Sequence, residues 1–230
     1  MPKIDPLPPV LASTLPLSVR QARLESLCEM IQGCRACPRM EGRKRVQGPA
    51  NGRAGVPVMF VAEAPGRAGA DRTGVPIHGD ATGSNFETLL ASTGWARSDV
   101  YITNAVLCNP RGDSGLNDTP ARDEIERCSH HLESTIRFVG PLVVATLGGI
   151  ALEAAGIIDP RVAGLRLGQA VGRPHTWFDR ILFPLYHPSP RALIRRNMSV
   201  QRADYTKLVR LVKSLSLEEL NNAQDSPAAR

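Results

Sequence analysis

Three polar segments of this chain each follow a short apolar run. The first is a long glycine-containing loop at 63–83, the second contains Asn104 in Y-I-T-N-A-V, and the third contains His187 in Y-H-P-S-P-R. Carboxylates and an imidazole can move protons or stabilise charge, and a side-chain amide offers both a donor and an acceptor. Taken singly, each has a plainer interpretation: a surface loop, an Asn that caps a strand end, a structural His. In open α/β sheets, however, ligands bind beyond the carboxyl ends of the strands, so we expect the three segments to share one site.

Four of the five cysteines have a spacing typical of a metal site. Cys34 and Cys37 form C-x2-C after a predicted helix, Cys108 follows a predicted strand, and Cys128 lies on the next predicted helix. Thiolates from three segments can therefore meet at one point, and both zinc and a four-iron cluster accept four thiolates. The alternative is that only C-x2-C matters, as a redox pair or by chance. Cys28 lies in an apolar helical pattern and is expected to be a core thiol.

The apolar patterns predict an α/β fold. Short β-branched runs alternate with helical patterns, which is typical of a mostly parallel sheet covered by helices. Strands are expected at 58–62, 100–107, 142–147 and 181–185. Helices are expected at 18–32, 83–92 and 120–138, and a short one after the glycine pair at 148–149. A last helix is expected to pack on the sheet through one face that carries Tyr205, Leu208, Val209, Val212 and Leu215.

The composition predicts one basic domain. The chain of 230 residues has 28 Lys and Arg against 22 Asp and Glu, a formal net charge of +6, which favours a polyanionic partner. No apolar run approaches the ~20 residues that span a bilayer, so we expect no membrane contact and a cytoplasmic location. The N-terminal stretch is rich in proline and the C-terminal stretch is small and polar. We therefore expect flexible tails at 1–17 and 216–230 around a single domain at 18–215, and a monomer.

Taken in order, the motifs resemble those of the uracil-DNA glycosylase superfamily, specifically its iron–sulfur families four and five. The shared features are C-x2-C, E-A-P-G, R-T-G-x-P-x-x-G-D-x-T-G, T-N-A-V-x-C, a cysteine on the next helix and H-P-S, over roughly residues 30 to 212. The resemblance implies a three-layer α/β/α fold with a central, mostly parallel four-stranded sheet. It implies a [4Fe–4S] cluster as the cofactor, held by Cys34, Cys37, Cys108 and Cys128. It also implies a DNA glycosylase that hydrolyses the N-glycosidic bond of uracil in single- or double-stranded DNA and so starts base excision repair.

The resemblance assigns catalytic roles to residues of the three segments. Asp80 matches the acid of the family-five G-D motif and is expected to activate or position water and to stabilise positive charge on the sugar. Asn104 is expected to read the uracil edge, and His187 to donate a hydrogen bond to uracil O2. The chain has neutral residues at 68–70, where family four keeps an acid, so Glu63 is the alternative to Asp80.

Further residues are expected to bind the substrate. The backbone of the E-A-P-G motif, at Ala64, Pro65 and Gly66, is expected to hold the base. Ser189 and Arg191 are expected to meet phosphates beside a basic group that includes Arg195, Arg196 and Arg202. Binding would then weaken as the salt concentration rises.

Two departures from the family pattern affect the predicted function. Both families usually place an aromatic residue where Ile77 stands, and base–aromatic stacking is worth ~1–3 kcal/mol, so Phe86 is the candidate to replace it. The loop at 109–118 contains no His, so no covalent trapping of DNA is expected. Two alternatives remain open. Ile77 suggests a non-catalytic or weakly catalytic binder of uracil-containing or abasic DNA. The cysteines alone suggest a redox or structural protein that is cross-linked by a metal site.

Overall fold

The computed structural model of the chain describes residues 15–112 and 114–224. Most of the predicted N-terminal tail and the end of the predicted C-terminal tail lie outside these residues. At the C-terminal end, helix α9 (Met198–Gln224) continues to Gln224, into the stretch for which a tail was predicted. None of the described helices is long and apolar enough to cross a membrane.

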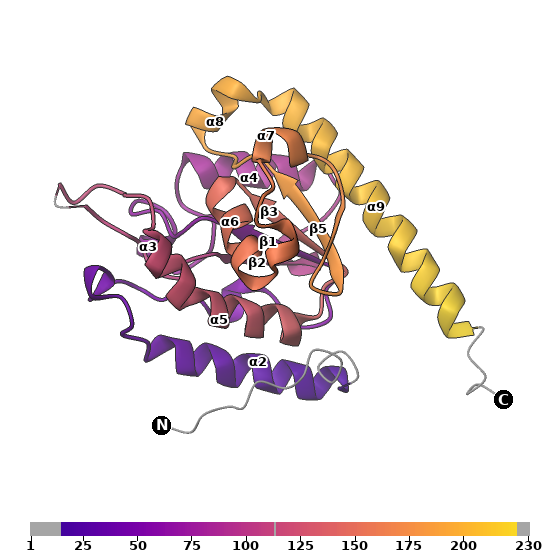
Figure 1. The fold of residues 1–230 in the computed structure, drawn as a ribbon, viewed down its shortest axis with the longest axis horizontal. Helices are drawn as coiled ribbons and strands as arrows, with labels where there is room; N and C mark the ends of the chain where they lie inside the picture. Colours follow the sequence, from indigo (N-terminus) through magenta and orange to yellow (C-terminus); the bar gives the residue numbers. More distant parts are fainter. Residues whose placement is uncertain (1–14, 113, 225–230) are drawn as a thin grey trace.

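A five-stranded sheet forms the centre of the molecule (Figure 1). Its order is β2-β1-β3-β5-β4, and the neighbours among β1, β2, β3 and β5 are parallel. The strands are β1 (Val58–Ala62), β2 (Val100–Asn104), β3 (Val143–Leu147), β4 (His175–Trp177) and β5 (Arg180–Leu185). The predicted mostly parallel sheet is therefore confirmed, with β2 ending at Asn104 instead of Leu107.

The sheet has one strand more than the four that the sequence predicted. The additional strand, β4, pairs antiparallel with β5 through a tight turn at Phe178 and Asp179, which both have positive φ. Three residues are too few to show an alternating pattern, and non-glycine residues at positive φ are uncommon, so the sequence carried no signal for this hairpin.

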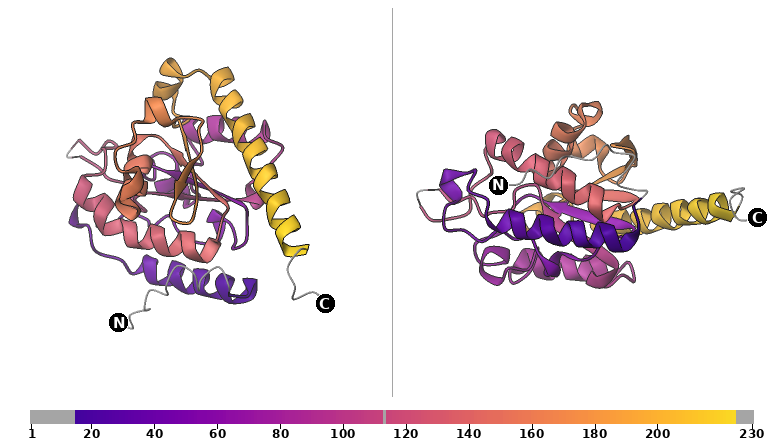
Figure 2. Two further views of the ribbon diagram at one scale, coloured as in Figure 1. Left: turned by 45° about the vertical axis from the view of Figure 1, so that its right-hand side comes forward. Right: turned by 90° about the horizontal axis from the view of Figure 1, so that it is seen from below.

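Helices cover both faces of the sheet, as the predicted three-layer fold requires. The long helices are α2 (Leu17–Gln32), α4 (Ala81–Ala91), α5 (Arg122–Val139), α6 (Gly149–Ile158) and α9. Three short helices, α3 (Ala70–Thr73), α7 (Leu167–Ala170) and α8 (Pro190–Arg195), and 3-10 turns at Pro38–Met40, Pro49–Asn51, Arg97–Asp99 and Pro160–Val162 complete the described elements. One core cluster joins the sheet to α2, α5 and α6, and the other joins it to α4 and α9. Both views in Figure 2 show α2 along α5 at the outside of the molecule.

The packing of the α4 and α9 face depends on aromatic side chains. Phe60 of β1 contacts Phe86 of α4 edge-on at 5.3 Å and stacks on Tyr205 of α9 at 5.8 Å, measured between ring centroids. All three rings are almost completely buried. Because α4 is held to β1 in this way, the loop between them is fixed at both ends.

The strand register brings the three polar segments together. Ala62 of β1 pairs with Asn104 of β2, and Leu147 of β3 pairs with Leu185 of β5. These four strands are parallel, so the segments that leave β1, β2 and β5 all start at the same edge of the sheet.

Candidate active site

A cavity of ≈ 370 Å³ lies beyond the carboxyl edge of the sheet. Its volume is within the range of small-molecule sites. Ten of the predicted catalytic and substrate-binding residues line it: Glu63, Ala64, Pro65, Gly66, Ile77, Asp80, Asn104, His187, Ser189 and Arg191. The structure therefore brings the three polar segments to one cavity.

Asp80 is held at the cavity by the start of α4. It is the N-cap residue of this helix, and its Oδ1 accepts a hydrogen bond from the Gly83 amide at 2.9 Å. The other oxygen, Oδ2, faces the loop after β1, where a Cβ on Gly66 would lie 2.9 Å from it and a Cβ on Gly69 would overlap it. The two glycines thus make room for the carboxylate, and the cap fixes its direction.

Asn104 presents an amide without a protein partner. It is the last residue of β2, is 1% exposed, and its Nδ2 has no hydrogen-bond partner among the described residues. A buried donor without a partner is costly, and a ligand in the cavity can supply the missing acceptor. Glu63, which also lines the cavity, is half-buried, and burial raises the pKa of its carboxyl group.

His187 is a neutral imidazole at physiological pH. Burial lowers its pKa to about 4, and the charge of Asp80 partly opposes this shift. Its side chain lies close to Gly148, where an added Cβ would stand 3.3 Å from the His187 Cβ. The loop is fixed from the other side by Asn85 of α4, whose Nδ2 donates to the Pro188 carbonyl at 2.9 Å. A neutral imidazole held in this way can donate one N–H hydrogen bond.

The predicted stacking residue Phe86 does not reach the cavity. It is 0% exposed and packs on Phe60 in the core, because it lies on the face of α4 that turns toward the sheet. Ile77 lines the cavity and has a φ of 47°, which is rare for a β-branched residue and marks local strain. An aliphatic side chain therefore forms the part of the wall for which the family pattern has an aromatic ring.

The sequence reasoning missed one wall of the cavity. Asn109 and Asn117, from the loop after Cys108, line it together with Pro110, Asp118 and His78. Asn109 Nδ2 donates to the Pro65 carbonyl at 2.6 Å and to Asn117 Oδ1 at 3.0 Å, and the Arg67 amide donates to the same oxygen at 2.8 Å. The one signal was the position of Asn109 just beyond a strand end, next to a predicted cysteine ligand.

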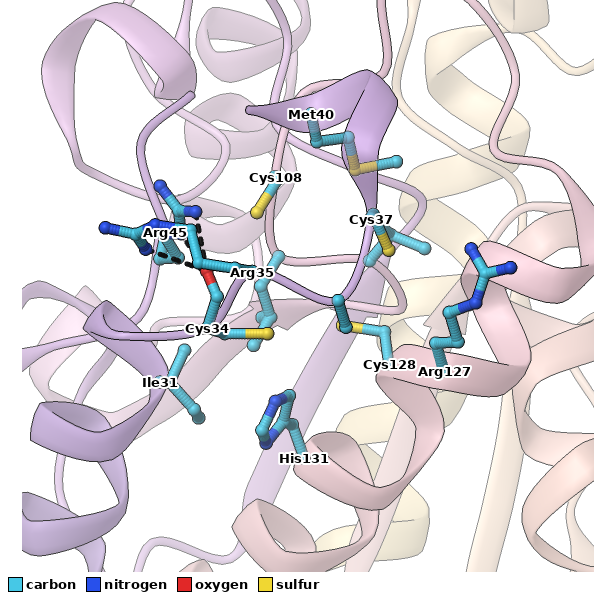
Figure 3. Close-up of a pocket in the computed structure, with 13 residues that line it drawn as sticks. Ile31, Cys34, Arg35, Cys37, Met40, Arg45, Cys108, Arg127, Cys128 and His131 are labelled. Carbon is cyan, nitrogen blue, oxygen red and sulfur yellow. Dashed lines mark hydrogen bonds between the residues drawn. The ribbon is translucent and has the colours of Figure 1, made fainter. Parts of the chain in front are cut away.

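A second cavity contains the four predicted cysteine ligands (Figure 3). Cys34 and Cys37 follow the end of α2, Cys108 follows β2, and Cys128 lies on α5. Cys28 does not line this cavity and packs against the core, as predicted. The rest of the wall is largely apolar, with Ile31, Met40, Val106 and Leu107, and it also contains His131, which the sequence reasoning did not single out.

The surroundings of the thiols combine burial with nearby positive charge. Burial raises the pKa of Cys108 to about 11 and that of Cys128 to about 12, and the other thiols contribute to both shifts. Arg45 opposes the shift at Cys108, and its guanidinium donates to the Cys34 carbonyl at 3.0 Å (Figure 3). Burial also raises the pKa of Cys37, and Arg127 partly opposes this shift. Four partly buried thiols near arginines are suited to a centre that deprotonates them and leaves a negative charge.

The donor set is compatible with more than one kind of centre. No group of three or more His, Cys, Asp or Glu side chains in the described ranges is placed to hold a single metal ion. Ligands of one zinc ion converge at ≈ 2.3 Å from a common point, whereas a four-iron cluster takes one thiolate at each iron and separates them. The four thiols around one cavity are a donor set that both kinds of centre use.

An arginine joins the cysteine turn to helix α5. Arg39, two residues after Cys37, binds both carboxylate oxygens of Glu124, at 2.9 and 2.5 Å, and Asp118 at 2.6 Å. The Glu124 side chain is only 6% exposed. This network fixes the turn independently of the thiols.

Comparisons with known proteins agree with the motifs. The model of the uracil DNA glycosylase superfamily matches residues 49–211. A type-4 uracil-DNA glycosylase of Thermotoga maritima is 33% identical over 171 residues, which are 74% of this chain and 83% of that protein. A type-4 enzyme of Pyrobaculum aerophilum is 38% identical over 150 residues (65% of this chain, 72% of that protein). A type-5 enzyme of Thermus thermophilus is 30% identical over 159 residues (56% of this chain, 70% of that protein).

Proposed function

We propose, since the chain belongs to the uracil-DNA glycosylase superfamily, that it hydrolyses the N-glycosidic bond of uracil in DNA and so starts base excision repair. The observation that carries this proposal is the single cavity lined by Asp80, Asn104 and His187. A base inside a duplex cannot reach such a cavity, so the nucleotide is extruded into it at a cost that is lowest for a mispaired base.

Asn104 recognises the extruded base. A carboxamide can donate to uracil O4 and accept from N3–H, whereas cytosine has a donor at position 4 and an acceptor at N3. The unpartnered Nδ2 of Asn104 in a buried position supports this role. With cytosine in the cavity, the Asn104 N–H would face the donor at position 4 and the Asn104 oxygen would face the acceptor at N3. These buried groups would stay without partners, which excludes the normal base.

Asp80 and His187 act on the two charges that bond cleavage creates. As the bond breaks, positive charge develops on the sugar and negative charge on the departing uracil. Asp80, as a carboxylate, stabilises the sugar cation and positions the attacking water. His187, as a neutral imidazole, donates to uracil O2. Because the His187 pKa is about 4, the ring is already neutral at the pH of the reaction and needs no prior loss of a proton.

A [4Fe–4S] cluster bound by Cys34, Cys37, Cys108 and Cys128 is part of the proposal. The common cavity, the partly buried thiols and the adjacent arginines support it. When bound, the cluster supplies a structural cross-link and a one-electron redox centre. It would tie the turn after α2 to the end of β2 and to α5, and Cys108 directly precedes Asn109 of the substrate cavity.

The DNA backbone is proposed to lie along the start of α8. Arg191 lines the cavity, and both it and Arg195 are exposed. Arg196 is less suited to this role, because it pairs with the buried Asp204 at 2.5 Å. The chain is proposed to act on this DNA as a cytoplasmic monomer.

A single-turnover assay tests the proposed function. The full-length protein is mixed in excess with a labelled oligonucleotide that contains one uracil, and alkaline treatment then cleaves the abasic product. Release of uracil, with a matched thymine oligonucleotide unchanged, is the expected result. If neither is cleaved while abasic DNA still binds tightly, the alternative of a non-catalytic DNA binder replaces the enzyme; the aliphatic Ile77 is the feature that favours this alternative.

A further inference from the structure

His131 is a buried imidazole whose ring has no protein partner. It lies on α5, is 7% exposed, and neither ring nitrogen has a hydrogen-bond partner among the described residues. The hydroxyl of Thr135, one turn further along α5, is engaged with the backbone, since its Oγ1 donates to the His131 carbonyl at 2.7 Å. A buried neutral imidazole still carries one N–H donor, and buried donors in proteins are almost always satisfied.

The ring points into the cavity of the four cysteines. Figure 3 shows it rising from α5 into the space between Cys34 and Cys128, and it forms part of the same cavity wall. The wall nearby consists mainly of apolar side chains, which offer no acceptor. An acceptor for the His131 N–H would therefore be a sulfur of whatever centre the cysteines hold.

The neighbouring cations have other partners. The guanidinium of Arg45 donates to the carbonyls of Cys34 and Arg43, and Arg127 pairs with Asp123 at 2.6 Å. His130, whose ring centroid is 3.8 Å from that of His131, is exposed and does not line the cavity. His131 is thus distinguished from them by a donor that is both buried and uncommitted.

We propose that the His131 ring donates an N–H···S hydrogen bond to a thiolate or sulfide of the [4Fe–4S] cluster, and so acts as a positioning residue that raises the reduction potential of the cluster. This inference rests on the proposed cluster. Hydrogen bonds to cluster sulfurs withdraw electron density, which stabilises the form that has gained one electron. In the voltammetry that measures the potential, the electron comes from the electrode and no proton transfer is required.

The test compares four single variants of the full-length protein with the wild type. His131→Phe removes the donor and keeps a flat ring of similar size. His131→Asn and His131→Gln retain an N–H near the positions of Nδ1 and Nε2, respectively. His130→Phe is the matched control on the adjacent, exposed position. Iron per chain and visible absorbance are measured first. Resonance Raman spectra in H2O and D2O then report hydrogen bonds to the Fe–S unit, and voltammetry reports the potential.

The wild type is expected to bind four irons and to show Fe–S stretching bands that shift in D2O. His131→Phe should lose the part of this shift that comes from the imidazole. It should also have a more negative potential, by about 59 mV for each tenfold change in the one-electron equilibrium. One of the two amide variants should restore both signals, and His130→Phe should match the wild type. If His131→Phe fails to retain iron while an amide variant retains it, the donor is needed to hold the cluster, which also supports the proposal.

Two outcomes overturn the inference while the cluster stands. One is a His131→Phe protein with wild-type iron content, D2O shift and potential. The other is loss of iron in all three His131 variants, which would indicate a packing role for the ring. A wild-type protein without iron would instead overturn the proposed cluster itself, and the catalytic proposal would remain testable by the uracil assay.

Discussion

Asp80 has two roles that a pair of substitutions can separate. Its Oδ1 caps α4 through the Gly83 amide, and the same carboxylate faces the cavity. Asn is as good an N-cap as Asp, whereas Ala removes the cap and costs about 1 kcal/mol of stability. Asp80→Asn should therefore unfold close to the wild-type temperature, and Asp80→Ala at a lower one.

The catalytic loss should be large and similar in both variants. A unit negative charge about 4 Å from the sugar cation, at an effective dielectric constant of about 20, is worth about 4 kcal/mol. Such a change in the barrier corresponds to roughly a thousandfold in rate. Asp80→Asn is thus expected to keep the stability of the wild type and to lose most of its rate of uracil release. A purely structural role of Asp80 cannot produce this combination.

The assay is single-turnover uracil release at saturating enzyme, together with thermal unfolding of each variant. Single-stranded substrate is used so that duplex opening does not limit the rate. The reasoning is refuted if Asp80→Asn releases uracil within a few-fold of the wild-type rate. In that case Asp80 is only a helix cap, and Glu63, whose pKa is raised by burial, becomes the acid to test.

Four further predictions address other parts of the molecule. In Ile77→Phe, free uracil should bind more tightly as an inhibitor by about 1 to 2 kcal/mol, or roughly tenfold, because a ring can stack on the base. An unchanged inhibition constant would mean that Ile77 does not face the base. The rate of uracil release should not rise as the pH falls through the ordinary His range near 6.5. The His187 pKa is about 4, so the neutral ring is lost only below that value. A rate that rises between about pH 7 and 5 would show that the imidazolium is the active form. Arg191→Ala should weaken binding of uracil-containing and uracil-free DNA alike and reduce the slope of log K against log salt by about 1, as measured by fluorescence anisotropy; an unchanged slope would remove Arg191 from the backbone contact. Arg39→Ala should lower the free energy of unfolding, measured in urea, by about 2 kcal/mol, because it leaves the buried Glu124 carboxylate without its arginine partner. A loss below about 0.5 kcal/mol would show that the network adds little stability.

Much of the candidate site could be predicted from local patterns. Parallel strands end at one edge of a sheet, so the loop after Ala62, the end of β2 at Asn104 and the loop that begins after Leu185 had to meet once the strands were identified. The cysteines followed the same logic, because Cys108 lies just beyond a strand and Cys128 on the next helix. The roles of the individual residues, in contrast, came from resemblance and stay proposals.

The missed features depend on contacts between distant segments. Phe86 carries the chemistry of a stacking residue, but its position on α4 directs it to Phe60 and away from the substrate. Asn109 and Asn117 look like ordinary loop residues until the loop folds back onto Pro65. The β4 strand exists only as a partner of β5 and is too short for any periodic signal.

By itself, the sequence determined the α/β class, the order of the four parallel strands and the long helices, and the chemistry available at the strand ends, because hydrophobic periodicity is a property of local segments. Only the tertiary structure decided which side chains face the two cavities and which remain without partners. The directions of Asp80 Oδ2, of the Asn104 amide and of the His131 ring depend on close approach between segments far apart in the chain. Such directions follow from packing at near-crystal density, where small displacements of one segment are transmitted to its neighbours.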